Sequence, residues 1–277
     1  MRNRISVVGA VTFLAAVACL TTTVAGQAPR AYRAPRTPDG KPNLNGTWQA
    51  LNNANWDIED HVARQGPVTA LGASFSVPAG VGVVEGGALP YRPEALAQKK
   101  DNQANWLTRD PEIKCYMPGI PRATYQGYPF QIVQTPTQVL MAYEFANASR
   151  IIYMNSKEDA PVDFWMGWSR GHWEGDTLVV DVTGLNDQTW FDRAGNFHSD
   201  ALHVTERYTA TGPDHLLYEA TIDDPKVFTR PWKIRMPLYR RQEADVQILE
   251  YKCVEFVEQL MYGQLGVVDP SSGAINK

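Results

Sequence analysis

The sequence predicts a mainly β protein, a single antiparallel β-barrel with a few peripheral helices. From Phe130 onward, short strand-like runs bounded by turn residues recur at a spacing of about 8–12 residues. Strands do not alternate with helical segments there, so a parallel sheet is not expected. Many consecutive antiparallel strands can bury their faces and remove their edges by closing into a barrel.

The composition is that of an ordinary globular protein and excludes one class of partner. Hydrophobic residues make up 44% of the chain and charged residues 20%, with a formal net charge of −4. Since there is no basic excess and no run of Lys and Arg, no nucleic-acid partner is expected. Aromatic residues, at 10% with 8 Trp, suit the binding of a flat molecule and suit a β-protein core equally well.

Residues 1–26 have the layout of a secretory signal peptide. Two arginines precede an uncharged apolar run that ends at the small residues Ala25 and Gly26. The strongly apolar part is too short for a good membrane span, so no span is expected after cleavage. The protein is therefore expected to be periplasmic or secreted, although a cut before Cys19 would give a lipoprotein.

The mature chain is expected to begin with an extended lead-in, residues 27–43, followed by the barrel domain, residues 44–277. The lead-in is Pro-rich and charged. The first strand is predicted within Asn43–Trp48.

A helical and Gly-rich insertion is expected at about 54–110. It holds a short helix over 54–66 and a helix over 93–110, with Leu96 and Ala97 on one side of the second helix. Between them, residues 68–90 are apolar, Gly-rich and without periodicity. Such a loop often forms a lid or an arm, so we expect it to lie over the barrel or over a neighbouring subunit, which leaves a homo-oligomer open.

Strands are predicted where short apolar or alternating runs lie between turn residues. These runs are 130–135, 138–145, 150–154, 167–173, 176–183, 201–210, 215–223, 232–240 and 246–252. The chain is expected to close with a helix over 253–265, whose apolar residues have helical spacing.

Two sets of motifs carry a resemblance to known proteins. Gly46-Thr47-Trp48 resembles the Gly-x-Trp of the first strand in lipocalin-like barrels. The longer motifs CYMPGIPR, HWEGDTLVVDVTGLND, FHSDALHVTERY and DDPKVFTRPW resemble a large family of exported bacterial proteins of unknown activity, over nearly the whole mature chain. This resemblance implies export and one barrel-like domain, and it implies no chemistry.

Cys115 and Cys253 are predicted to form a disulfide. They are the cysteines that remain after loss of the signal peptide, and two cysteines in an exported chain favour one bond. A metal or catalytic role has less support, because neither has another Cys or a His within about five residues.

The segment 201–223 predicts which side chains face the barrel interior. Registered on a turn at Gly212-Pro213, strand alternation produces one clearly more apolar face. That face comprises Leu202, Val204, Glu206 and Tyr208 opposite Leu216, Tyr218, Ala220 and Ile222. Burial would raise the pKa of Glu206, as a general acid requires. The structural alternative is a Glu206 bonded to Tyr218 or paired with an arginine.

The candidate catalytic residues lie in and after the long polar loop that begins at Gly184. His198 is the expected base, Asp200 or Asp187 would orient it, and Glu206 would be the acid. His198 is thus predicted to hydrogen-bond a carboxylate at the barrel mouth. An ordinary polar loop is the alternative.

The residues expected to contact a substrate are aromatic, charged or polar and lie on the same rim. They are Trp190, Asp192, Arg193, His203, Tyr208, Trp165 and Asp223. No metal site is expected, because His203 and Glu206 fall on opposite faces of their strand.

The favoured function is a cofactor-independent lyase, isomerase or hydrolase that acts on a mid-sized, partly apolar small molecule. No cofactor is expected, since the chain has no nucleophile elbow, phosphate loop or dinucleotide fingerprint. The alternative is a non-catalytic, lipocalin-like carrier of a hydrophobic or aromatic molecule. A mainly apolar pocket without a convergent His and carboxylate would favour that carrier.

Overall fold

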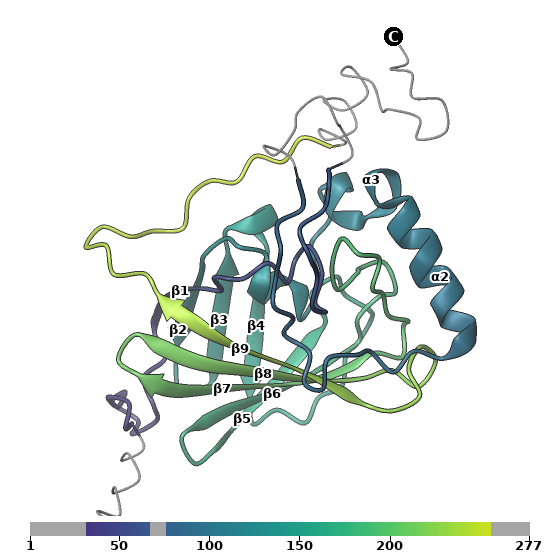
Figure 1. The fold of residues 1–277 in the computed structure, drawn as a ribbon. Coiled ribbons are helices and arrows are strands. Elements are labelled where there is room, and N and C mark those ends of the chain that lie inside the picture. Colours follow the sequence, from purple (N-terminus) through teal and green to yellow (C-terminus); the bar gives the residue numbers. More distant parts are fainter. Residues whose placement is uncertain (1–31, 67–75, 256–277) are drawn as a thin grey trace, which may run out of the picture. The chain divides into compact units, whose positions relative to one another are not determined.

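The computed structural model describes residues 32–66 and 76–255, and in them nine strands form a closed barrel in chain order (Figure 1). The strands are β1 (Gly46–Gln49), β2 (Phe130–Gln134), β3 (Gln138–Tyr143), β4 (Ser149–Met154), β5 (Trp168–Glu174), β6 (Thr177–Thr183), β7 (His203–Gly212), β8 (His215–Asp223) and β9 (Trp232–Arg240). The barrel closes because β1 pairs with both β2 and β9. The predicted barrel is therefore confirmed.

The barrel is not wholly antiparallel, and in this detail the prediction was wrong. β4 and β5 run parallel and pair only from Ile152 with Ser169 to Met154 with Gly171. Parallel neighbours need a long crossover instead of a tight turn. Residues 155–167 form that crossover and carry the chain back to the end of the barrel where β4 began.

The strand directions divide the connections between the two ends of the barrel (Figure 1). One end, called the turn end here, carries the tight connections 135–137, 175–176 and 213–214. The other, called the loop end, carries the long connections 50–129, 184–202 and 224–231. Because long loops rather than tight turns place functional side chains, the loop end is where a site is expected.

The interior face predicted for β7 and β8 is confirmed. Glu206 lies opposite Ala220 and Tyr208 opposite Tyr218, and all four are buried. The alternation of apolar and polar residues therefore predicted the inward face of this hairpin correctly.

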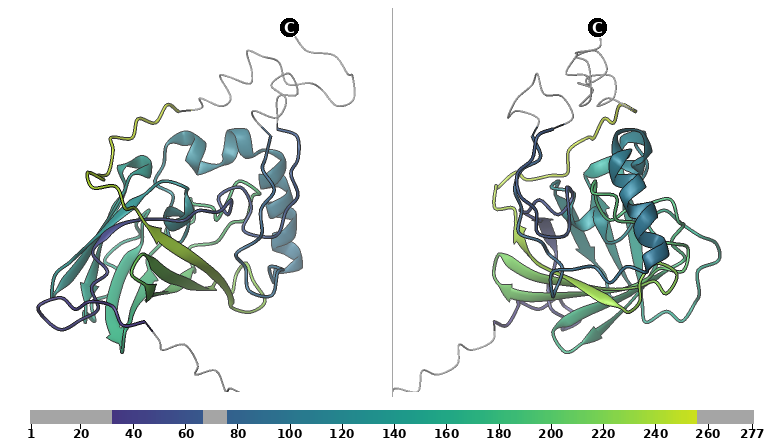
Figure 2. Two further views of the ribbon diagram at one scale, coloured as in Figure 1. Left: turned by 60° about the vertical axis from the view of Figure 1, so that its left-hand side comes forward. Right: turned by 45° about the vertical axis from the view of Figure 1, so that its right-hand side comes forward.

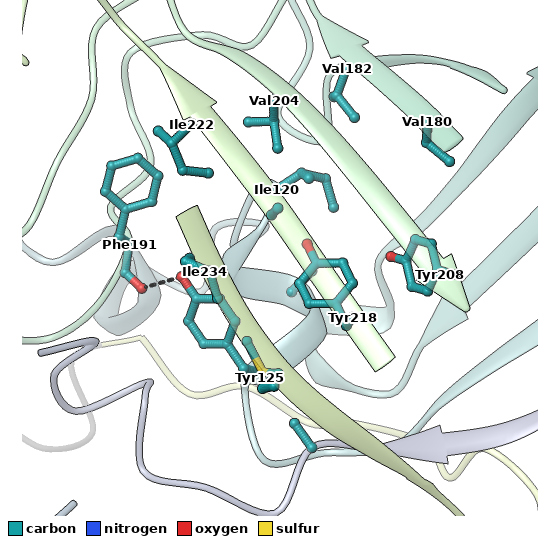
Figure 3. Packing of buried hydrophobic residues seen from close by; sticks show 14 of the residues in the cluster. Ile120, Tyr125, Val180, Val182, Phe191, Val204, Tyr208, Tyr218, Ile222 and Ile234 are labelled. Carbon is teal, nitrogen blue, oxygen red and sulfur yellow. Dashed lines mark hydrogen bonds between the residues drawn. The ribbon is translucent and has the colours of Figure 1, made fainter. Parts of the chain in front are cut away.

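The interior is filled by side chains at the loop end and does not open there as a free mouth. Ile120 and Tyr125 pack in the same core cluster as the interior-facing residues of β6 to β9 (Figure 3). The Tyr125 hydroxyl donates to the Phe191 carbonyl at 2.9 Å. The segments 111–125 and 184–202 thus plug this end of the barrel.

Helices α2 (Pro93–Ala104) and α3 (Trp106–Arg109) replace the single helix predicted over 93–110. Leu96 and Ala97 are exposed, whereas Ala95 and Asn102 are buried. α2 lies against the loop 184–202 (Figure 2), where a Cβ on Gly195 would be 2.5 Å from the Gln103 nitrogen. The absence of that Cβ permits the close approach.

The helix predicted over 54–66 is absent from the described residues of that stretch, which form turns and isolated bridges. Its backbone groups bond to distant parts of the chain. The Ile58 nitrogen donates to the Asp192 carboxylate at 2.9 Å, and His61 exchanges both backbone hydrogen bonds with Gly80 at 3.0 Å. These tertiary partners replace the internal bonds that a helix needs.

The described part of the Gly-rich segment, residues 76–90, lies against the barrel as predicted, while 67–75 fall outside the described residues. The Glu85 nitrogen donates to the Lys233 carbonyl at 2.9 Å, and the Arg235 nitrogen to the Val83 carbonyl at 2.8 Å. β1 is short and pairs with β9 only near Tyr239 and Arg240. The segment therefore covers the part of the β9 edge that β1 leaves unpaired.

The last predicted strand, 246–252, is absent, because the closed barrel offers it no edge. This stretch runs past the β3–β4 connection instead, where the Leu249 nitrogen donates to Glu144 at 3.1 Å. Cys253 then bonds to Cys115, with Cα atoms 5.7 Å apart, which confirms the predicted disulfide. The predicted helix over 253–265 lies almost entirely outside the described residues.

None of the helices within 32–66 and 76–255 is long and apolar enough to cross a membrane.

Candidate functional site

His198 does not form the predicted pair with a carboxylate. The ring is buried, its Nε2 lies 2.6 Å from the Thr189 hydroxyl, and its Nδ1 lies 2.9 Å from the Ser199 carbonyl. A carbonyl only accepts, so Nδ1 carries the proton and Nε2 accepts from Thr189. Burial lowers the pKa of His198, which favours this neutral ring.

The two carboxylates expected to orient His198 lie in solvent. Asp187 is exposed, and Asp200 is exposed and pairs with Lys226 at 2.5 Å. The loop folds with most of its aromatic residues and its histidine inward, whereas Asp187 and Asp200 stay hydrated, because an unpaired buried charge is costly. Neither Asp187 nor Asp200 therefore forms the predicted pair with His198.

Glu206 adopts the structural alternative. Arg150 donates to it through Nη1 at 2.6 Å and Nη2 at 3.1 Å. The hydroxyls of Tyr208 and Tyr218 donate to its Oε1 at 2.9 and 2.8 Å. With Arg150 and Glu206 both buried, the carboxylate is held by four donors and has no free oxygen that faces a substrate.

Asp192 is buried and supports the loop rather than a ligand. It accepts from the Ile58 nitrogen at 2.9 Å and from the Asn196 backbone and side-chain nitrogens at 3.1 and 2.6 Å. Burial, with a further contribution from the charge of Asp57, raises the pKa of Asp192 to about 7.

This pKa predicts a pH dependence of stability. The unfolded value is about 3.9, so between about pH 4 and pH 7 the folded state holds a proton that the unfolded state has lost. This contribution to the free energy of unfolding therefore falls as pH rises to about 7 and is constant above it. The free energy of unfolding can be measured by denaturant titration at several pH values in this range. Plotted against pH, it should have a less negative slope for Asp192→Asn than for the wild type. Equal slopes would contradict the assignment.

Arg193 belongs to a buried charge network that sequence analysis missed. It donates to Glu112 at 2.9 and 3.1 Å, and its guanidinium lies 4.4 Å from the Trp56 ring centre. Arg122 bridges Glu112 at 2.6 Å and Asp110 at 2.7 and 2.9 Å. Although burial opposes ionisation, Arg193 and Arg122 lower the pKa of Glu112 to about 2. These residues stand in loops and in short 3-10 helices, Pro111–Lys114 and Arg122–Tyr125, which are too short for a periodic pattern to identify them.

The other residues predicted to contact a substrate lie apart from one another. His203 faces outward, as strand alternation predicted, and lies 3.3 Å from Asp181. Asp223 is exposed. Trp190 is buried, and its backbone forms an isolated antiparallel β-bridge with Phe197. The predicted substrate-binding residues are therefore not gathered around one cavity.

A cavity lies in the barrel wall, between β4 and β5. Its volume is about 400 Å³. Pairing with β5 begins only at Ile152, so the first residues of β4 are paired with β3 alone. Phe164, near the end of the crossover, does not continue the pairing with β4. Its backbone nitrogen donates to the Gly184 carbonyl at 2.7 Å. The parallel junction thus leaves a gap in the wall.

The lining of this cavity includes side chains from both faces of the wall. Arg150, Met166 and Ser169 are buried, whereas Ser149 and Ile151 are exposed. The remaining lining is mostly aromatic or apolar and comprises Met117, Tyr153, Asp163, Phe164, Trp165, Gly167 and Trp168. The cavity lining therefore combines exposed residues of the outer surface with buried residues of the wall, among them Arg150. Trp165 is the predicted substrate-binding residue that lies in it.

One donor of the buried Arg150 guanidinium has no partner within the described part of the chain. Its terminal nitrogens bond to Glu206, to Tyr208 at 3.1 Å and to Ser169 at 3.3 Å. Its Nε is buried and has no hydrogen-bond partner among the described residues. A buried donor of this kind is normally satisfied by protein, water or ligand. No sequence signal separated Arg150 from other strand arginines.

No model of a known protein family matches the chain, and no curated protein matches it. The function therefore has to be inferred from the geometry. Within 32–66 and 76–255, no group of His, Cys, Asp or Glu side chains has the arrangement of a metal site.

Proposed function

We propose that the protein is a non-catalytic binding protein, or carrier, for a mid-sized and partly aromatic molecule held in the wall cavity. The observation that carries this proposal is the composition of the cavity lining, which is mostly aromatic and apolar and includes few polar or charged residues. Binding sites of this size are usually mostly apolar, with few polar groups that orient the ligand.

The pairing of the titratable groups supports a carrier over an acid/base enzyme. Glu206 is occupied by Arg150 and two tyrosines, and His198 is occupied by Thr189 and Ser199. A general base must reach its substrate and be free to take a proton. Neither group meets both conditions in this arrangement.

The proposal is tested with N-phenylnaphthylamine, an uncharged dye that fluoresces in apolar sites. We expect binding to the wild type and at least about tenfold weaker binding to Ser149→Trp, because an indole at this lining position fills the cavity. Gln131→Trp is the matched control, since Gln131 is also exposed on a strand but does not line the cavity. Equal binding by both variants would show that the dye binds elsewhere.

A further inference from the structure

We propose that the outer face of β2, β3 and β4 is the surface through which two copies of this protein form a two-fold symmetric dimer. These three strands are neighbours in the barrel (Figure 1). Three features of the face support the dimer: an apolar row that crosses the strands, the lack of charge around that row, and its continuation into the lining of the wall cavity. The dimer does not require the proposed carrier function.

Three large aliphatic side chains form a row across this face. Val133 pairs with Leu140 of the next strand, and Leu140 pairs with Ile151 of the strand after it. Their exposed fractions are 40%, 41% and 39%, whereas their neighbours along each strand are buried or half-buried. Side chains paired in this way on one sheet face are about 5 Å apart. The row is therefore one contiguous apolar patch, which marks an interaction surface, and not three scattered residues.

The outward-facing residues of β2, β3 and β4 include no charged side chain. Beside the apolar row they are Gln131, Gln138, Ala142, Ser149 and Tyr153. The core of a protein–protein interface is depleted in charged residues in the same way. The outer face of β7 to β9 differs, because Arg207 pairs there with Glu219, and Glu219 with Arg235. The side of the barrel formed by β2 to β4 thus has the composition of an interface.

The lack of charge favours a second copy of the chain as the partner. Each copy has a formal net charge of −4, so two copies repel each other, and this repulsion is smallest where a charge-free face meets a charge-free face. In a two-fold dimer the same patch meets itself, so the two apolar rows can pack together without burying a charge. A partner of different sequence is commonly selected by complementary charge, which this face does not supply.

The apolar row continues into the lining of the wall cavity. Ile151 lines that cavity together with Trp165 and with Met117, which is 40% exposed. Tyr116 is 42% exposed and contacts Trp165, with ring centres 4.8 Å apart. The exposed apolar surface thus extends beyond the three strands. A second copy packed on this side would remove more apolar area from water than the row alone offers, which stabilises the dimer.

The test measures the molar mass of the protein by analytical ultracentrifugation over a range of concentrations. We expect the wild type to reach the mass of two chains at about 100 μM or below. Leu140 is the centre of the row and therefore lies near the two-fold axis, so Leu140→Glu brings two carboxylates together there and should raise the dissociation constant at least about tenfold. Leu217→Glu is the matched control, because Leu217 is a half-buried, outward-facing leucine on β8. That variant should remain a dimer.

A wild type that keeps the mass of one chain at this concentration would overturn the dimer. Equal weakening by Leu140→Glu and Leu217→Glu would overturn the assigned face, since the copies would then meet elsewhere. If Leu140→Glu does not fold, Leu140→Cys replaces it: mild oxidation should link two copies through the new thiols, and Leu217→Cys should stay unlinked on a non-reducing gel. A folded Leu140→Cys protein that does not cross-link would also contradict the assignment. Dye binding to the wild type is measured separately, so failure of the dimer leaves the carrier function standing.

Discussion

Replacement of Arg150 by methionine is expected to lower the free energy of unfolding by about 3–5 kcal/mol. Methionine has a similar length but leaves the Glu206 carboxylate buried without its counter-charge. The side chains of Arg150 and Glu206 are 2% and 0% exposed, so water cannot replace the lost partner. Urea or guanidinium unfolding followed by tryptophan fluorescence measures the change.

Two further variants show whether the loss comes from the unpaired charge. Arg150→Met with Glu206→Gln should recover part of the stability, because the amide oxygen still accepts from Tyr208 and Tyr218. Arg170→Met on the neighbouring strand removes an arginine paired with Asp159, which is 93% exposed, and should cost less than about 1 kcal/mol. A similar loss for Arg150→Met and Arg170→Met would contradict this explanation.

Removal of the Cys115–Cys253 disulfide is expected to lower the free energy of unfolding by about 2–5 kcal/mol. The cysteines are 138 residues apart in the sequence, and a bond that closes so long a loop restricts the unfolded chain strongly in the chain-entropy picture. The bond also anchors the stretch after β9, which is irregular and mostly exposed between Gln242 and Glu255.

The measurement compares unfolding of the wild type with and without a thiol reductant, beside Cys253→Ser. The reduced wild type and the variant should lose similar stability. Added reductant should have no effect on a variant in which both Cys115 and Cys253 are serine. Unchanged stability of Cys253→Ser would contradict the predicted contribution of the disulfide.

The barrel strands could be predicted from the sequence because their signal is local. In β7 and β8, polar and apolar residues alternate with a period that matches the pleat, and the turn at Pro213-Asp214 sets their register. Local patterns do not reveal how strands that lack a tight turn are joined. The sequence therefore predicted every barrel strand but missed that β4 and β5 are parallel.

The candidate site depended on contacts that no local pattern encodes. The sequence predicted that Glu206 faces inward, and it included a pairing with arginine among the alternatives, but it could not select Arg150 from the strand before the crossover. For His198 the sequence showed nearby carboxylates, whereas the folded loop placed Thr189 and Ser199 against the ring. Proximity along a loop does not determine which side chains become buried together.

The sequence by itself determined the strand-rich class, the inward face of the β7–β8 hairpin and the pair of cysteines that bond. These features depend on alternation, turn residues and composition, all of which are properties of neighbouring residues or of the whole chain. The tertiary structure alone decided where the cavity lies. It forms where the crossover 155–167 returns beside β4, and pairing there begins too late to close the wall. Such a gap depends on the three-dimensional course of two segments that are separate in the chain.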